Sequence, residues 1–133
     1  MPDTRTQDLC KYRLAQSEET LQVAKDCLNN RHFKDSINRS YYAAFHAVRA
    51  VLALESVDFK RHKDVVAYFN KNYVATGKFD REIGRNLSRL QQIREKCDYN
   101  DYFIVALEDT EAQFKASKMI ADAVKVFVQE IEQ

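Results

Sequence analysis

The stretch NRSYYAAFHAVRA, residues 38–50, combines tyrosine and alanine with few charged side chains. Between residues 36 and 54 the only formal charges are Arg39 and Arg49. At 100° per residue, Arg39 and His46 fall on one helical face, two turns and roughly 10 Å apart along the axis. Tyr41 and Val48 belong to an apolar stripe on the other side. A helix with so few charges is expected to be covered on both sides, so this stretch predicts a helix of an all-α fold that is packed on two faces.

The rest of the chain also favours helices. It contains only two glycines and one proline, and these are the residues that interrupt helices most strongly. Apolar spacing predicts helices over about residues 5–29, 36–55, 63–76 and 111–132, and a further one that begins after Asp80. Asp35 or Ser36 is expected to cap the second helix, and Gly77 to end the third. The predicted fold is an up-and-down bundle of four or five helices.

Composition limits the protein class. With 21 basic and 20 acidic residues the formal net charge is +1, so any contact with nucleic acid must be local. The three cysteines lack CxxC spacing, which favours a reduced intracellular protein over a disulfide scaffold or a zinc site. The chain has no apolar run of about 18 residues. We therefore expect a cytoplasmic protein with no membrane association, no metal and no cofactor.

Two charged positions call for partners. Arg94 falls near the middle of the apolar stripe of the fourth helix, and Asp98 follows one turn later, so a structural ion pair is expected, with ligand binding as the alternative. On the second helix, small alanines lie beside Arg39 and His46. We expect a second copy of the chain to cover this face, in a homodimer through the second helix that brings two histidines together.

Three segments resemble a known family: residues 37–74 (INRSYYAAFHAVRAVLALESVDFKRHKDVVAYFNKNYV), residues 93–101 (IREKCDYND) and residues 111–128 (EAQFKASKMIADAVKVFV). Together they resemble HEPN domains, in particular the small stand-alone prokaryotic ones. The resemblance covers about residues 8–130, so we expect residues 1–133 to form a single HEPN-like helical domain. It implies a bundle of four or five helices that is often dimeric.

The resemblance also implies a function. Many HEPN proteins are metal-independent endoribonucleases with an arginine, usually followed by a polar residue, and a histidine after four to six intervening residues. Arg39, Ser40 and His46 match this motif. His46 would be the general acid or base and Arg39 the phosphate clamp, with Asn38, Ser40 and Tyr42 in support. The position of the motif in the second helix, inside an aromatic block, departs from the ribonuclease members and equally favours an interface.

Other HEPN proteins are non-catalytic. They bind RNA or nucleotide, or they partner an antitoxin or a minimal nucleotidyltransferase, and on this reading Tyr99 or Tyr102 could receive a nucleotide. A third interpretation is a purely structural interaction protein that uses Arg39 and His46 as interface residues. His32 and His62 lie in polar turns and are expected at the surface.

Overall fold

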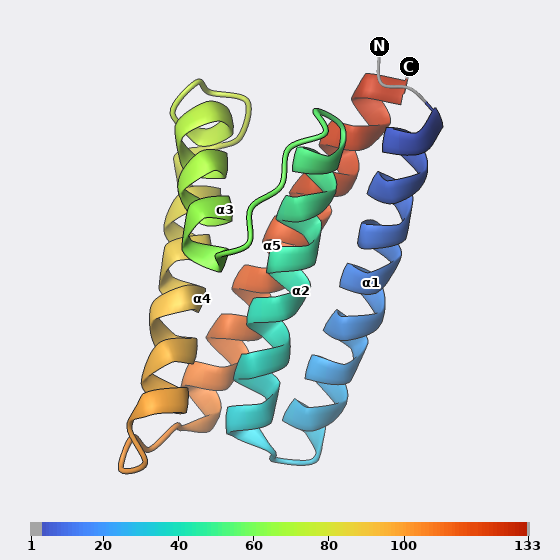
Figure 1. Ribbon diagram of the computed structural model, residues 1–133. Helices are drawn as coiled ribbons and strands as arrows, with labels where there is room; N and C mark the ends of the chain where they lie inside the picture. The colour runs from blue at the N-terminus through green and yellow to red at the C-terminus, as the bar shows by residue number, and fades with distance from the viewer. Residues whose placement is uncertain (1–3, 133) are drawn as a thin grey trace.

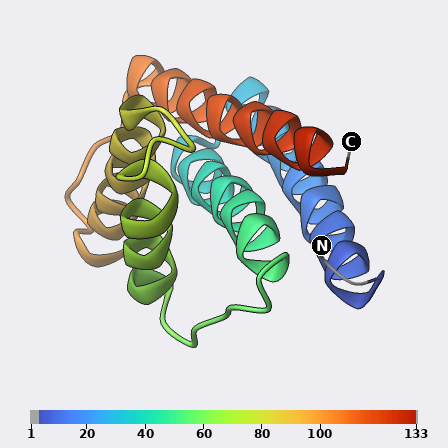
Figure 2. The same ribbon diagram turned by 90° about the horizontal axis from the view of Figure 1, so that it is seen from above.

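The computed structural model describes residues 4–132, and over these residues the chain forms helices and no strand. The helices are α1 (Thr4–Asn29), α2 (Phe33–Ala53), α3 (His62–Phe69), the π-helical turn η1 (Asn70–Val74), α4 (Arg81–Tyr99) and α5 (Leu107–Glu132). They pack side by side as a bundle, with α2 in the middle (Figure 1). Seen from above, α1 lies on one side of α2, α3 and α4 lie on the other side, and α5 crosses behind α2 (Figure 2). The predicted all-α bundle of five helices is confirmed.

A tight turn joins α1 to α2. Arg31 adopts a left-handed backbone conformation with φ of 64°, which lets the chain reverse within three residues. Helix α2 then begins at Phe33, earlier than predicted. The expected cap at Asp35 or Ser36 is wrong, because Ser36 already lies inside the helix and its hydroxyl donates to the carbonyl oxygen of Ala24 at 2.8 Å. This buried bond ties α2 to α1.

Helix α1 covers the alanine face of α2. The hydroxyl of Ser17 donates to the carbonyl oxygen of Ala43 at 2.7 Å, and Ala43, Ala47 and Ala50 are fully buried. Small side chains let the two helices approach closely enough for this bond. The expectation that a second copy of the chain must cover these alanines is therefore wrong, because the same chain covers them. A homodimer through α2 stays a prediction, but the alanine face no longer supports it.

Aromatic side chains hold the shorter helices. Phe69 stacks on Tyr73 and packs against Phe79, and Phe79 packs against Phe127 of α5 with ring centroids 4.9 Å apart. The turn before α4 contains Gly77, whose φ of 84° strains any residue with a side chain. These contacts fix α3 and η1 on the bundle, and they place the start of α3 beside α2.

The last connector is short and exposed. Helix α5 begins at Leu107, four residues before the predicted Glu111, because the Asp109 carboxylate accepts a hydrogen bond from the Ala106 amide at the helix start. Tyr99 at the end of α4 and Tyr102 in the connector are almost fully exposed. None of the helices within residues 4–132 combines the length and hydropathy needed to cross a bilayer.

Candidate functional site

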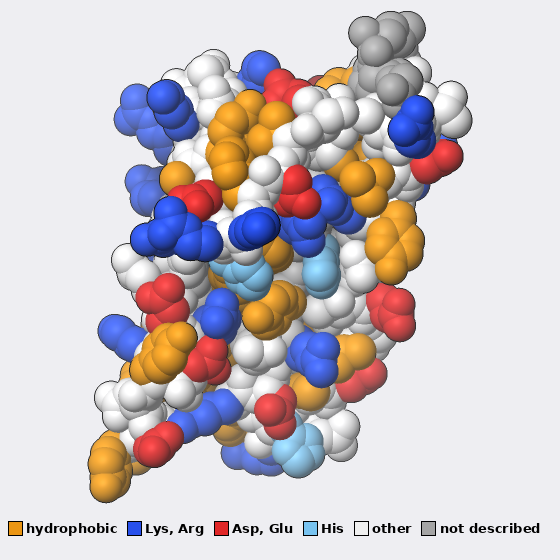
Figure 3. Space-filling view, in the orientation of Figure 1, with side chains coloured by type: hydrophobic (Ala, Val, Ile, Leu, Met, Phe, Trp, Pro, Cys, Tyr) orange, Lys and Arg blue, Asp and Glu red, His pale blue; other side chains and the backbone are white. Residues whose placement is uncertain are grey.

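One narrow stripe of α2 faces solvent. Arg39, Tyr42, His46 and Arg49 follow one another at intervals of three or four residues, and each is exposed or half-buried while most of the helix is fully buried. We call these four residues the open stripe. Figure 3 shows histidine side chains in the middle of this face, with lysine and arginine side chains around them. The open stripe is therefore where α2 can meet a ligand.

His46 lies half-buried in the open stripe. Its Nδ1 atom is buried and has no hydrogen-bond partner among the described residues. Burial lowers the pKa of His46, and the positive charges of Arg49 and Arg13 lower it further. The imidazole is thus mainly neutral at pH 7, the form that can accept a proton.

His62 lies beside His46, contrary to the expectation of a plain surface residue. It is the first residue of α3, and its ring stacks on Phe45 with centroids 4.0 Å apart. Tyr42 contacts both histidines, with centroids 6.4 Å from His46 and 5.7 Å from His62. Burial lowers the pKa of His62, as do the charges of Arg94 and Arg49. Two neutral imidazoles of one chain therefore share a face.

A buried phenol sets the orientation of His62. The Tyr41 hydroxyl lies 3.1 Å from Nδ1 of His62. Burial raises the pKa of Tyr41 to about 12, so the phenol keeps its proton at neutral pH. When this hydroxyl donates to Nδ1, the proton of the neutral ring is on Nε2. In that tautomer the outer nitrogen of His62 donates a hydrogen bond, and in the imidazolium form both ring nitrogens carry a proton and the Tyr41 oxygen accepts from Nδ1.

Helix α4 brings a further cation to this face. The Arg94 guanidinium pairs with Asp98 at 3.0 Å, the ion pair expected from their spacing. It also lies over the rings of Tyr41 and Tyr42, 4.8 and 5.5 Å from their centroids. Stacking of this kind holds a guanidinium in a fixed place. Arg94 thus has both a structural contact and a position near His62.

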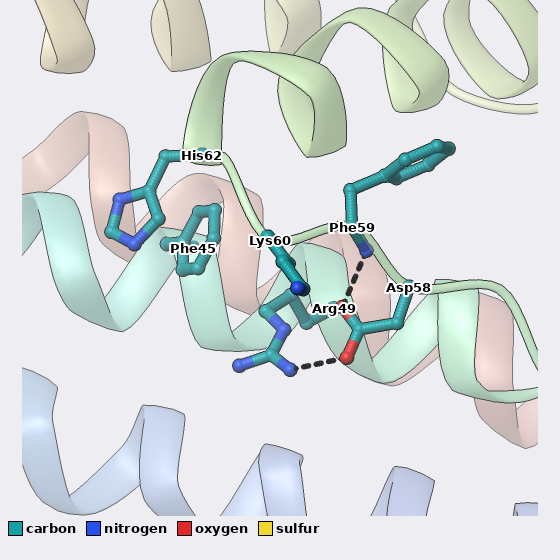
Figure 4. Close-up of a pocket in the computed structure, with 6 residues that line it drawn as sticks. All are labelled: Phe45, Arg49, Asp58, Phe59, Lys60 and His62. Atoms are coloured by element: carbon teal, nitrogen blue, oxygen red, sulfur yellow. Dashed lines mark hydrogen bonds and ion pairs between the residues drawn. The ribbon is translucent and has the colours of Figure 1, made fainter.

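A pocket of about 390 Å³ lies at the α2–α3 connector, with His62 in its lining. Figure 4 shows the six residues that line it, Phe45, Arg49, Asp58, Phe59, Lys60 and His62. Arg49 donates to the Asp58 carboxylate at 2.8 Å, and Arg13 of α1 reaches the same oxygen at 3.4 Å. Except for Asp58, the charged and titratable groups here are basic, which suits an anionic ligand.

The other residues of the predicted motif lie apart. Arg39 is exposed two helical turns from His46, and because helix side chains lean toward the N-terminus it leans away from the histidine. Arg49 leans toward His46 and lowers its pKa. Ser40 is buried, with its hydroxyl unpartnered among the described residues, and Asn38 is half-buried near Arg39.

Comparison with known proteins decides the family. A sequence model of the HEPN domain matches residues 10–128, nearly the whole chain. The chain belongs to the HEPN family. This HEPN protein is 28% identical to a UPF0332 protein of Thermotoga maritima, over 93% of this chain and 94% of the relative. It is 30% identical to a Methanocaldococcus jannaschii protein named "Putative toxin MJ0605", over 86% of this chain and 85% of that one.

The low histidine pKa values predict a pH dependence of stability for this HEPN protein. Because the pKa of His46 is lower in the folded chain than in the unfolded chain, the unfolded chain binds a proton first as the pH falls below about 6.5. The free energy of unfolding should therefore fall below that pH. Urea denaturation at pH 7.5 and 5.5 should show a smaller loss for His46→Gln than for the wild type, and an unchanged loss for His32→Gln. Equal losses in all three proteins would refute the assignment.

Proposed function

We propose that this HEPN protein is a metal-independent endoribonuclease that acts as the toxin of a toxin–antitoxin pair. The observation that carries the proposal is the pair of half-buried histidines, His46 and His62, on one open face among arginines. Two imidazoles can serve as base and acid in the same reaction when one is neutral and the other is protonated. One chain supplies both, so the chemistry needs no second copy of the chain.

The proposed reaction is attack of a ribose 2′-hydroxyl on the adjacent phosphorus. His46 takes the proton of the 2′-hydroxyl, the new P–O bond forms, and the bond to the 5′-oxygen breaks. His62, in its protonated imidazolium form, gives its Nε2 proton to the departing 5′-oxygen and becomes neutral. The products are a 2′,3′-cyclic phosphate and a 5′-hydroxyl end. After this step His46 is protonated and His62 is neutral, the reverse of their starting states. Hydrolysis of the cyclic phosphate can return both histidines to the protonation states in which they began.

The remaining motif residues would hold the strand. Arg39 leans away from His46, so it suits a neighbouring phosphate of the same RNA better than the reacting one. Asn38, next to it, can donate to the same phosphate. Tyr42 offers a ring between the two histidines on which a base can stack. Ser40 is buried and would support the site only by packing.

The relatives support the role of a toxin. Three Methanocaldococcus jannaschii relatives carry the word toxin in their names, among them one at 30% identity and another at 24% over 74% of this chain. A toxin needs an antitoxin that silences it, so we expect a protein partner. If this partner is a nucleotidyltransferase, the 83% exposed Tyr99 offers an accessible hydroxyl to which it could attach a nucleotide. In that step the phenol oxygen attacks the α-phosphorus of a nucleoside triphosphate, the phenol proton passes to a base of the partner, and pyrophosphate leaves.

Cleavage of labelled RNA in EDTA tests the proposal. We expect the purified wild type to cut a mixture of single-stranded RNAs and to leave 5′-hydroxyl ends. DNA of the same sequences should stay intact because it lacks the attacking 2′-hydroxyl. Circular dichroism would establish that the protein is folded. A folded protein that leaves every RNA intact would refute the nuclease and favour the non-catalytic binding module.

A further inference from the structure

The Asp58 carboxylate occupies two arginines that lie next to His46. One of its oxygens lies 2.8 Å from a nitrogen of Arg49 and 3.4 Å from a nitrogen of Arg13, and the other accepts the Phe59 amide at 2.9 Å. Two guanidinium groups therefore share a single carboxylate. Burial acts to raise the pKa of Asp58, but the hydrogen bonds from Arg49 and the Phe59 amide outweigh it and hold the pKa below its usual value.

The two arginines differ in how they are held. Arg13 is buried and also donates to the backbone carbonyl of Arg49 at 3.0 Å, which fixes it in place. Arg49 is partly exposed, and its Nε atom is buried without a hydrogen-bond partner among the described residues. Lys60 lines the same pocket. The cluster thus has more positive charge than Asp58 neutralises and an unused donor on Arg49.

The Asp58 side chain is half-exposed, and Asp58 lies in the connector between α2 and α3, outside any helix. A phosphate group presents oxygen acceptors and negative charge to arginine in the same way as a carboxylate. We propose that Arg49 and Arg13 form an oxyanion site for a phosphate of an RNA strand, and that Asp58 occupies this site in the free protein.

This proposal deepens the proposed function, because the strand would be the one that His46 and His62 cut. Arg49 lies one helical turn from His46 and leans toward it, so a phosphate held there would be next to the reacting one. Asp58 would compete with every incoming strand. Binding is therefore expected to be weaker than the arginines alone would give.

Binding of a fluorescent 2′-O-methyl RNA oligonucleotide, which lacks the attacking hydroxyl, tests the site without cleavage. Asp58→Asn should lower the Kd about 3–10-fold at low salt, because it removes the competing charge. Arg49→Gln should raise the Kd and make the dependence of log Kd on log salt shallower by about 0.7. In the double variant that combines Arg49→Gln with Asp58→Asn, the Kd should be no lower than in Arg49→Gln alone. Arg49→Lys keeps the positive charge but loses the two parallel donors of the guanidinium group, so its Kd should lie between those of the wild type and Arg49→Gln.

The matched control is Asp64→Asn. Asp64 is another aspartate paired with an arginine, Arg61, at 2.9 Å, but it lies outside the pocket. An equal gain from Asp64→Asn would show a general charge effect and overturn the proposal, as would a gain that persists in the double variant. Thermal unfolding of each variant would establish that it is folded.

Inorganic phosphate distinguishes a strand from a free ion. We expect it to compete with the oligonucleotide only weakly, and competition at concentrations near the oligonucleotide Kd would assign the site to a free phosphate instead. Cleavage and binding can fail separately. If the wild type cut no RNA but the variants showed the expected pattern of Kd values, the proposal of a nuclease would be refuted. The proposal of the oxyanion site would still be supported.

Discussion

His46→Ala should lower the rate of RNA cleavage by at least about 100-fold, the usual contribution of a general acid or base. The side chain is only half-buried, and its Nδ1 atom has no partner to lose among the described residues. The fold should therefore survive the change. The measurement is cleavage of a labelled RNA in EDTA, with circular dichroism on the same samples.

The chain offers a matched control for this loss. His32 is an exposed histidine at the turn between α1 and α2, and His32→Ala should cleave at the wild-type rate. His62→Ala should lose activity to a similar extent as His46→Ala, because each imidazole has one half of the proton transfer. Full activity in His46→Ala would remove this residue from the chemistry, and equal losses in all three variants would point to a general effect.

Ala43→Leu should lower the free energy of unfolding by about 1–3 kcal/mol, the usual effect of forcing extra methylene groups into a packed interior. Ala43 is fully buried where α1 lies against α2, and the Ser17 hydroxyl binds its carbonyl oxygen. A larger side chain has to push α1 away. Urea denaturation measures the change, and Ala15→Leu on the exposed side of α1 is the control that should change little.

The same variant separates two accounts of the alanine face. If α1 of the same chain covers it, the loss of stability should be independent of protein concentration. A variant with unchanged stability as a monomer but a weakened dimer would show that a second copy covers the alanines. That result would restore the dimer interface expected from the sequence.

Local pattern was enough to predict much of the fold. The scarcity of glycine and proline and the apolar spacing were enough to predict the helices, and Asp80 precedes α4 as expected. The third predicted helix is shorter than expected, because α3 and η1 end at Val74 and Gly77 lies in the following turn. The four-residue spacing of Arg94 and Asp98 gave their ion pair. These features depend on residues within a turn or two of each other, which is the range over which sequence pattern is informative.

The site depended on contacts that no local pattern contains. His62 reaches Phe45 only because η1 and Phe79 fix α3 against the bundle, and the sequence around His62 is a polar turn. The alanine face of α2 was read correctly as covered, but pattern alone does not say whether α1 or a second copy covers it. The place of Arg94 in an apolar stripe indicated that its charge needs a partner. The structure adds the Tyr41 ring as a second contact of this guanidinium.

The most direct test of the account is a nuclear magnetic resonance titration of the three histidine rings with a 2′-O-methyl RNA oligonucleotide. The account places RNA on the open stripe of α2 and on the start of α3. It predicts that the ring signals of His46 and His62 shift together and saturate at the same oligonucleotide concentration, while those of His32 stay in place. Binding that shifts His32 and leaves His46 and His62 unchanged would contradict the account.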